Sequence, residues 1–378
     1  MGTMKETTMR NADTRSPRRA TLPIAAAAAL ALLAATATPS AATAQEGTAQ
    51  DELVRFARTP CTSIETPPTL HCPDAGCGSP IVINPGPAVE MKTRRTYFLD
   101  YPCDLKRGEK VTFLLSLHGG GSYANWQRHY FPLLDYVQQY RLVVATPSSP
   151  IQVWTGDDDE YLRNIVEAVY AELGAVNVRA FWLIGHSQGG QTSNRLLTTD
   201  FFRERLDGWL SLSGGRLGSK REDVRAPIPR GSVTTGPRPP AAGAPARPTA
   251  MRLAADASVL PDFPFSHIYS SGEHELTAAG LPDRSPWAEQ IGCGPQTRLP
   301  DVIDTRGGYI YDARPSDSRN PIWGLDPGPG RAEVYVYSGC KGGHVVADVI
   351  RMGKGHTEGF EPRVTAAILE LMLSAGER

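Results

Sequence analysis

A serine enclosed by glycines is the first candidate for chemistry in this sequence. It is Ser187, in the pentapeptide GHSQG at 185–189, where the apolar stretch 178–185 ends and a stretch with helical spacing begins. A strand-to-helix turn tight enough to need small residues two positions before and after the serine raises its hydroxyl above the sheet edge. The turn also directs the N-terminus of the next helix at the reacting centre. The pentapeptide therefore predicts a nucleophilic serine, and a glycine-rich turn without chemistry is the alternative.

A serine hydroxyl needs a general base, because it is a weak nucleophile at neutral pH. In sheets with such a turn the chain order is Ser, then Asp or Glu, then His. Two of the eight histidines follow the last predicted strands, His344 and His356. We favour His356, because it comes after the final strand, where doubly wound sheets place functional residues. His344 lies in the turn from the predicted strand 332–339 into the final one and is the second choice.

The base needs an acid that orients it, and the turn that follows FSHIYSS in the predicted stretch 265–276 offers two carboxylates. They are Glu273 and Glu275 in the sequence GEHE. The fourth residue of a G-x-x-D/E turn commonly has this role in such sheets, which favours Glu275. Glu273 remains open, and either glutamate could be a solvated loop charge.

The negative charge that develops on a substrate oxygen needs two backbone N–H donors. One donor is usually the residue after the nucleophile, here Gln188. The other is expected in the sequence HGGG at 118–121, because glycines allow the backbone to approach a substrate closely. Gly120 is the first candidate in this stretch, and Gly121 is the second.

Three aromatic residues near the same predicted edge are candidates for contact with a substrate. They are Tyr123, Trp126 and Trp154. Packing in the core explains their presence at least as well, because aromatic side chains bury large apolar areas.

Strands alternate with helices along most of the chain. Strands are predicted from short apolar runs bounded by turn residues, and helices from apolar residues that recur at threes and fours. The predicted strands are 95–102, 110–121, 141–149, 178–185, 207–215, 265–276, 332–339 and 344–352, and the helical stretches are 130–140, 157–174, 191–202 and 362–376. This alternation requires crossover connections, so we predict an α/β fold with a mostly parallel central sheet flanked by helices.

The helix 157–174 has predicted ends as well as a predicted face. Asp157 followed by Glu160 resembles a capping box, and Gly174 is typical of a helix exit.

Residues 1–44 have the pattern of an export signal. A basic stretch precedes an alanine-rich apolar run, and Ala42 and Ala44 form a small-residue cleavage site. A membrane anchor is the alternative, but a spanning helix needs about 20 predominantly apolar residues and this run is short. Cleavage predicts a periplasmic or secreted protein with no further membrane segment.

The six cysteines are consistent with export, where disulfides form and persist. Four come early, Cys61, Cys72, Cys77 and Cys103, and two come late, Cys293 and Cys340. Three disulfides are expected, and the pairing within the first four is open. A zinc site that uses His71 with the neighbouring cysteines is the alternative, although the spacing matches no known finger.

After the signal, residues 45–94 are predicted to form an N-terminal extension pinned by disulfides, and residues 95–378 a single domain. A stretch rich in proline, glycine and arginine at 216–250 interrupts this domain and is predicted to be a surface insert. The formal net charge of −1 argues against nucleic acid or an anionic membrane as a partner. The sequence does not indicate an oligomeric state.

The chain resembles α/β-hydrolases of the poly(3-hydroxybutyrate) depolymerase and feruloyl esterase type over roughly residues 95–373. The motifs that carry the resemblance are FLLSLHGGG, FWLIGHSQGG with the helix before it, WAEQIGC, and YSGCKGG leading to GKGHTEG. The resemblance implies a disulfide between Cys293 and Cys340. The family usually has aspartate as the acid and often GHTWPG around the histidine, and it has no counterpart of the insert.

These features together predict an exported serine carboxylic ester hydrolase that acts through Ser187, His356 and Glu275 and needs no metal or organic cofactor. Feruloyl or acetyl esters and polyesters are all open as substrates. A serine peptidase with the same three residues is one alternative, because a fold does not determine the leaving group. A catalytically silent binding protein is the other.

Overall fold

The computed structural model describes residues 52–56, 59–62, 87–225, 259–310, 321–324 and 328–376. The predicted signal 1–44, most of the extension 45–94 and positions 226–250 of the predicted insert lie outside these ranges. Among the described residues, no helix is long and apolar enough to cross a membrane.

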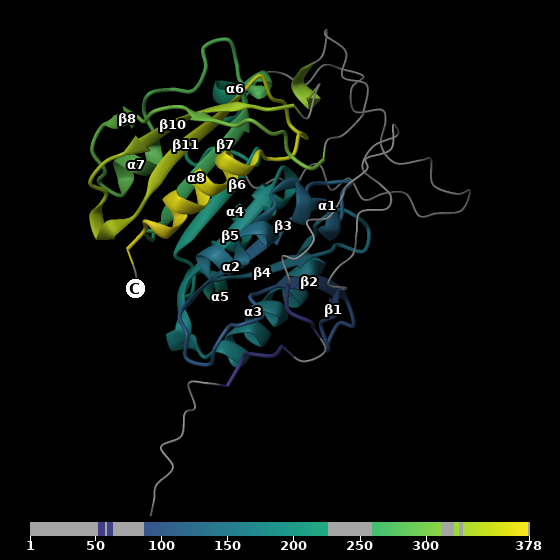
Figure 1. The fold of residues 1–378 in the computed structure, drawn as a ribbon. Coiled ribbons are helices and arrows are strands. Elements are labelled where there is room, and N and C mark those ends of the chain that lie inside the picture. Colours follow the sequence, from purple (N-terminus) through teal and green to yellow (C-terminus); the bar gives the residue numbers. More distant parts are fainter. Residues whose placement is uncertain are drawn as a thin grey trace, which may run out of the picture. The chain divides into compact units, whose positions relative to one another are not determined.

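An eleven-stranded sheet forms the centre of this part of the chain (Figure 1). Its strands are β1 (Ala88–Val89), β2 (Thr96–Asp100), β3 (Val111–Leu117), β4 (Leu142–Pro147), β5 (Val178–His186), β6 (Gly208–Leu212), β7 (Ser266–Gly272), β8 (Gln296–Arg298), β9 (Val302–Ile303), β10 (Arg331–Tyr337) and β11 (Val346–Met352).

The strands are arranged in the order β1-β2-β4-β3-β5-β6-β7-β11-β10-β8, and β9 also pairs with β10. The six central strands from β4 to β11 are parallel to one another. The strands on both flanks run antiparallel. The prediction of a mostly parallel sheet is confirmed, and it places the carboxyl ends of β3, β5, β6, β7 and β11 at one edge.

Helices connect these strands. They are α1 (Ala124–Tyr130), α2 (Val137–Tyr140), α3 (Asp159–Leu173), α4 (Gln188–Leu196), α5 (Asp200–Arg203), α6 (Arg221–Val224), α7 (Pro286–Gln290) and α8 (Pro362–Leu373), with short 3-10 turns between them. Glycine at position 174 ends α3 with a φ of 81°, as predicted. The predicted capping box at its start is wrong: Thr155 and Asp158 form the box, on a 3-10 turn (Gly156–Asp158) that leads into α3.

Alternate residues of the central strands enter two separate cores. Phe113 and Leu115 of β3 belong to one core, and Leu114 between them belongs to the other. The first core includes the apolar face of α3, and the second includes those of α1 and α8. Helices on both faces explain why these strands are apolar almost throughout.

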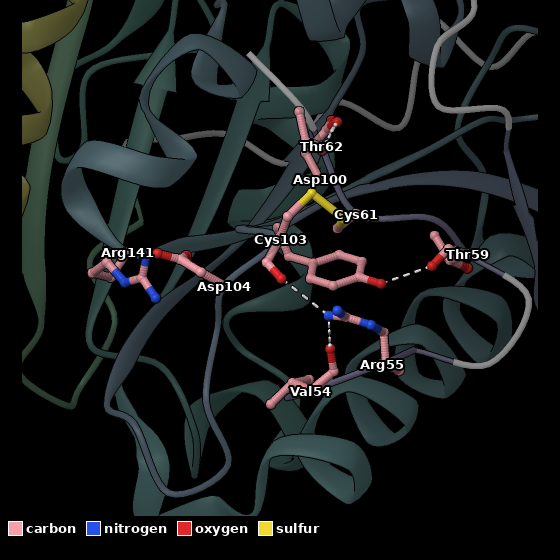
Figure 2. The surroundings of a disulfide bond; sticks show 10 residues. Val54, Arg55, Thr59, Cys61, Thr62, Asp100, Cys103, Asp104 and Arg141 are labelled. Atoms are coloured by element: carbon pink, nitrogen blue, oxygen red, sulfur yellow. Dashed lines mark hydrogen bonds and ion pairs between the residues drawn. A yellow bond between two sulfur atoms is a disulfide. The ribbon is translucent and has the colours of Figure 1, made fainter. Parts of the chain in front are cut away.

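A disulfide between Cys61 and Cys103 attaches the N-terminal segment to the loop that follows β2 (Figure 2). The guanidinium of Arg55 donates to the carbonyl oxygen of Cys103 at 3.1 Å. The hydroxyl of Thr62 donates to the buried carboxylate of Asp100 at 2.8 Å. Residues before the predicted domain boundary at 95 therefore pack against the sheet.

The late cysteines, Cys293 and Cys340, form a second disulfide, as the resemblance implied. Because Cys61 is bonded to Cys103, its thiolate is not available for the zinc site considered above. Cys72 and Cys77 lie outside the described residues. No cluster of three or more potential metal ligands occurs in the described parts of the chain.

The beginning of the predicted insert belongs to the packed domain, contrary to the prediction. Arg216 is 1% exposed and forms an ion pair with Asp348 of β11 at 2.8 Å. Leu217 and Val224 are also buried. The composition of the insert, rich in proline and glycine, did not predict that Arg216 is buried and paired with a carboxylate.

Candidate active site

The backbone at Ser187 has the sharp turn that the pentapeptide predicted. Ser187 has φ 51° and ψ −113°, between β5 and the first residue of α4. A Cβ at position 185 would lie 2.3 Å from the carbonyl oxygen of Gly189, and one at position 189 would lie 2.4 Å from that of Leu117. Glycine is therefore required on both sides of the serine, because no larger residue fits.

The residue before the serine connects this turn to the loop that carries the candidate base. The Nε2 atom of His186 lies 2.9 Å from the carbonyl oxygen of His356. The hydroxyl of Tyr130 donates to the same oxygen at 3.0 Å. Burial lowers the pKa of His186 far below its ordinary value, so this ring is neutral and donates through Nε2–H. We did not single out His186 from the sequence, because it occupies the variable position of the motif.

The structure brings the predicted acid and base together. His356 donates from Nδ1 to Oε2 of Glu275 at 2.7 Å. His356 follows β11, and Glu275 lies in a 3-10 turn (Glu273–Glu275) at the end of β7, the neighbouring strand. The side chain of Glu275 is wholly buried and that of His356 is 9% exposed.

The other carboxylate oxygen of Glu275 is also saturated with donors. Its Oε1 atom accepts from the hydroxyl of Ser213 at 2.5 Å, from the hydroxyl of Ser271 at 3.2 Å and from the amide of Gly272 at 3.1 Å. Ser213 directly follows β6 and has a φ of 55°, a backbone conformation that residues with a side chain rarely adopt, and its hydroxyl points at the acid. These supporting residues were missed; the sequence SGG after β6 was the available signal.

An arginine that was not predicted forms an ion pair with the same carboxylate. Arg225 bonds through Nη2 to Oε2 of Glu275 and through Nη1 to the carbonyl oxygen of Ser213 at 2.7 Å. Burial alone would raise the pKa of Glu275. The charge of Arg225, the contact with His356 and the bond from Ser213 overcome that effect, and the pKa lies far below its ordinary value. Glu275 is therefore ionised although it is buried.

A second network of buried charges supports the loop that carries His356. Arg351 bonds to Glu361 at 3.0 Å and donates to the backbone carbonyls of Glu358 and Gly359. The Glu358 carboxylate accepts from the amide of Gly355, directly before the histidine. Glu358, where the resembling family often has tryptophan, is therefore part of the loop scaffold.

The candidate donors for an oxyanion lie on adjacent backbone segments. A Cβ at Gly120 would come within 3.1 Å of the Gln188 side chain, so the glycine loop and the start of α4 are in close contact. The amide of Gly121 donates to the carbonyl oxygen of Gln152 at 2.7 Å. His118 holds the loop: its ring bonds to the carbonyl oxygen of Gly119 and to the amide of Ser149.

Two of the three candidate substrate aromatics are buried. Trp126 is 6% exposed and stacks on Tyr130. Trp154 is 4% exposed, and its indole donates to the carbonyl oxygen of His118 at 2.7 Å. Both pack as core residues, the alternative that the sequence left open. Tyr123, at the start of α1, is half-buried, and a contact with substrate remains a prediction for it.

The second choices for base and acid lie elsewhere. His344 precedes β11, at the opposite end of that strand from His356. Glu273 is exposed, and its carboxylate accepts from the amide of Gly353 at 2.7 Å. The structure thus places neither side chain in the contact that Glu275 and His356 make.

No protein-family model matches the sequence, and no curated protein matches it. Solved structures that resemble it include the acetyl xylan esterase of Aspergillus awamori, with 12% identity over 75% of this chain and 95% of the other and a TM-score of 0.42. Another is the fluorophosphonate-binding serine hydrolase F of Staphylococcus aureus, with 14% identity over 48% of this chain and 74% of the other and a TM-score of 0.32. A third is the esterase 2 of Thermogutta terrifontis, with 16% identity over 50% of this chain and 73% of the other and a TM-score of 0.33. The strand order, with a sharp serine turn at the end of β5, decides the fold class. The chain has the α/β-hydrolase fold.

Proposed function

We propose that this protein is an exported serine carboxylic ester hydrolase. The contact between Glu275 and His356, made at neighbouring strand ends and linked through His186 to the Ser187 turn, carries the proposal. A glycine-rich turn without chemistry would have no use for a buried acid–base pair on two other strands. The two disulfides among the described residues are consistent with export, because such bonds persist in oxidising compartments.

In the proposed reaction the Ser187 hydroxyl attacks the ester carbonyl carbon. His356 accepts the hydroxyl proton at Nε2, because its Nδ1–H is donated to Glu275. The ring then gives the proton to the leaving alcohol, and an acyl-enzyme remains. Water, deprotonated by the same ring, attacks the acyl carbon and releases the acid and Ser187.

The negative oxygen formed in each step is assigned to the amides of Gln188 and Gly120. Gln188 is the first residue of α4, and the first amides of a helix have no partner within the helix. Gly120 is preferred to Gly121, whose amide already donates to Gln152. A donor of this kind typically contributes about 100- to 1,000-fold to kcat.

Three activities are separated by one set of assays on the purified mature protein. An ester hydrolase turns over a small chromogenic acetate ester, a peptidase turns over a peptide anilide, and a silent binding protein turns over neither. A panel of feruloyl, acetyl and polyester substrates then identifies the acyl group. Ester turnover that is unchanged in Ser187→Ala would refute the proposal, because it would arise from another site or from a contaminant.

A further inference from the structure

Arg225 occupies a place beside the acid and the base that the proposed reaction does not explain. Its Nη2 atom bonds to the carboxylate oxygen of Glu275 that also accepts from His356. The same Nη2 atom lies 3.1 Å from Nδ1 of His356. Since Nδ1 carries a proton and Nη2 is also a donor, this contact is an approach of two donors rather than a hydrogen bond.

The guanidinium is fixed in this place. Its Nη1 atom donates to the carbonyl oxygen of Ser213, the residue whose hydroxyl also donates to Glu275. The side chain of Arg225 is 11% exposed. Burial strengthens its electrostatic effect on the neighbouring ring, because solvent screens it poorly.

Among the contacts that the structure describes, the charged side chains that touch the His356 ring are those of Arg225 and Glu275. Other titratable groups lie on the elements around this cluster. The groups are Tyr130 of α1, His186 of β5, Tyr269 of β7, Glu273 and His274 of the turn after β7, and Arg351, Lys354, Glu358 and Glu361 of β11 and the loop after it. Burial raises the pKa of both tyrosines and lowers that of His186, so these three are neutral. The four charges at β11 form ion pairs with one another.

The two charges act on the ring in opposite directions. A carboxylate stabilises a protonated imidazole, whereas a cation destabilises it, and each such charge at this range typically shifts a titration by about one unit or more. The guanidinium also neutralises part of the carboxylate charge through their ion pair. An acid without this partner would hold the ring protonated, and therefore inactive as a base, up to a higher pH.

We propose that Arg225 is a positioning residue of the active site: it holds the Glu275 carboxylate in register with His356 and opposes protonation of the ring, so that the base remains available in mildly acidic surroundings. This inference rests on the proposed ester hydrolase function. Arg225 acts through the acid and the base and takes no part in bond making.

The test is the pH dependence of kcat/KM for a chromogenic acetate ester in wild type, Arg225→Gln and Arg225→Lys. We expect the acidic limb of the profile to move to higher pH by about one unit in R225Q, and to remain near that of wild type in R225K, which keeps the charge. Arg298→Gln is the control, because it removes an arginine charge from an exposed group that pairs with Asp301 and Glu333. Its acidic limb should not move.

Two results would overturn the inference. An acidic limb at the wild-type position in a folded R225Q protein would show that the charge does not act on the base. An equal shift in R225Q and R225K would show that shape, not charge, matters. Ester turnover by the wild type that disappears in Ser187→Ala establishes the proposed function independently, so failure of the one is distinguishable from failure of the other.

A second variant covers the case in which R225Q does not fold. Glu275→Gln keeps the shape of the acid and leaves the guanidinium as the charge beside His356, and adding Arg225→Gln to it removes both partners of the ion pair. In the residual reaction with a fluorophosphonate probe, the acidic limb of the double variant should lie at higher pH than that of Glu275→Gln, because the cation that opposes protonation of the ring is gone. Equal limbs in the two proteins would contradict the proposed action of Arg225.

Discussion

The two halves of the candidate active site are held in place by different kinds of interaction. On the β3 and β5 side, the serine turn and the glycine loop are positioned by backbone and by neutral rings, and burial lowers the pKa of His118 to about 4. On the β7 and β11 side, Glu275 and His356 are held by ion pairs of Arg225 and Arg351. We call these the backbone side and the charged side.

The difference follows from what each side does. The backbone side must approach a substrate oxygen closely, which requires amides and residues without a Cβ. The charged side must keep a carboxylate ionised away from water, which requires a cation and several donors around it. Substitutions on the backbone side should therefore lower activity when they add a side chain that does not fit. Substitutions on the charged side should lower activity when they remove a charge.

The largest effect is expected at Ser187, because it lies in the sharp turn of the backbone side and gives its proton to the base of the charged side. Ser187→Ala removes one hydroxyl and no packing, so the fold should remain and kcat should fall by about a million-fold. Ester turnover and thermal unfolding of the same preparation measure both. A tenth of wild-type activity in the alanine protein would contradict the assignment of Ser187 as the nucleophile.

His356→Ala should cost nearly as much, because it removes the base from the charged side. His344→Ala is the matched control, at the opposite end of β11 from His356, and it should leave kcat close to that of wild type. The two variants are compared at one pH with the acetate ester. The reverse ranking would assign the base to His344 and contradict the role of His356 in the charged side.

Glu275→Gln should lower kcat by about ten-thousand-fold, because the ring loses the carboxylate that fixes its tautomer and stabilises its protonated form. Glu273→Gln is the matched control, because it makes the same substitution at the other glutamate of the same turn. It should cost little, because Glu273 is exposed and bonds only to the amide of Gly353 among the contacts that the structure describes. Equal losses in the two variants would remove the distinction between them.

Gly119→Ala tests the backbone side. A Cβ at this position would lie 2.8 Å from Nδ1 of His186, the ring that bonds to the carbonyl oxygen of His356. Displacing that ring should lower kcat by up to about 100-fold, the cost of a small misplacement. Gly156→Ala is the control, because a Cβ there meets nothing within 4 Å. Equal activity of the two variants would show that the backbone side tolerates a side chain after all.

The backbone side was easier to predict from sequence than the charged side, and the reason is physical. Glycine at position 185 reports a local steric need, because a Cβ there would meet Gly189, and the motif of five residues contains both glycines. The acid and base could be predicted from chain order, strand ends and the spacing of the G-x-x-D/E turn. Ser213 and Arg225 could not, because their contacts with Glu275 join positions 62 and 50 residues apart in the chain.

The fold shows the same division. Apolar runs predicted the six central strands, β3 to β7 and β11, within a few residues, because burial on both faces leaves a continuous signal. The short flanking strands β1, β8 and β9 were missed. Each of these strands has only two or three residues, which is too short to show an alternation of apolar and polar residues. The burial of Arg216 within an apparently irregular insert depended on a partner in β11.

The smallest effect on catalysis is expected at the Cys61–Cys103 disulfide, which attaches the N-terminal segment to the loop after β2 (Figure 2) and contains no residue of either side of the site. Asp100 accepts from Thr62 of this segment and from Arg128 of α1, so a buried chain of hydrogen bonds leads from the segment to α1 and not directly to a residue of the site. Replacing both cysteines by serine should leave kcat nearly unchanged and lower the free energy of unfolding by about 2–4 kcal/mol, because the unfolded chain gains freedom. Denaturant unfolding and ester turnover, each with and without reductant, measure the two quantities. Replacing Cys293 and Cys340 by serine is the control, because it removes the other disulfide that the structure describes. A large loss of kcat in the Cys61 and Cys103 variant at full folding would show that the segment acts on α1, and that the backbone side depends on more than its own glycines.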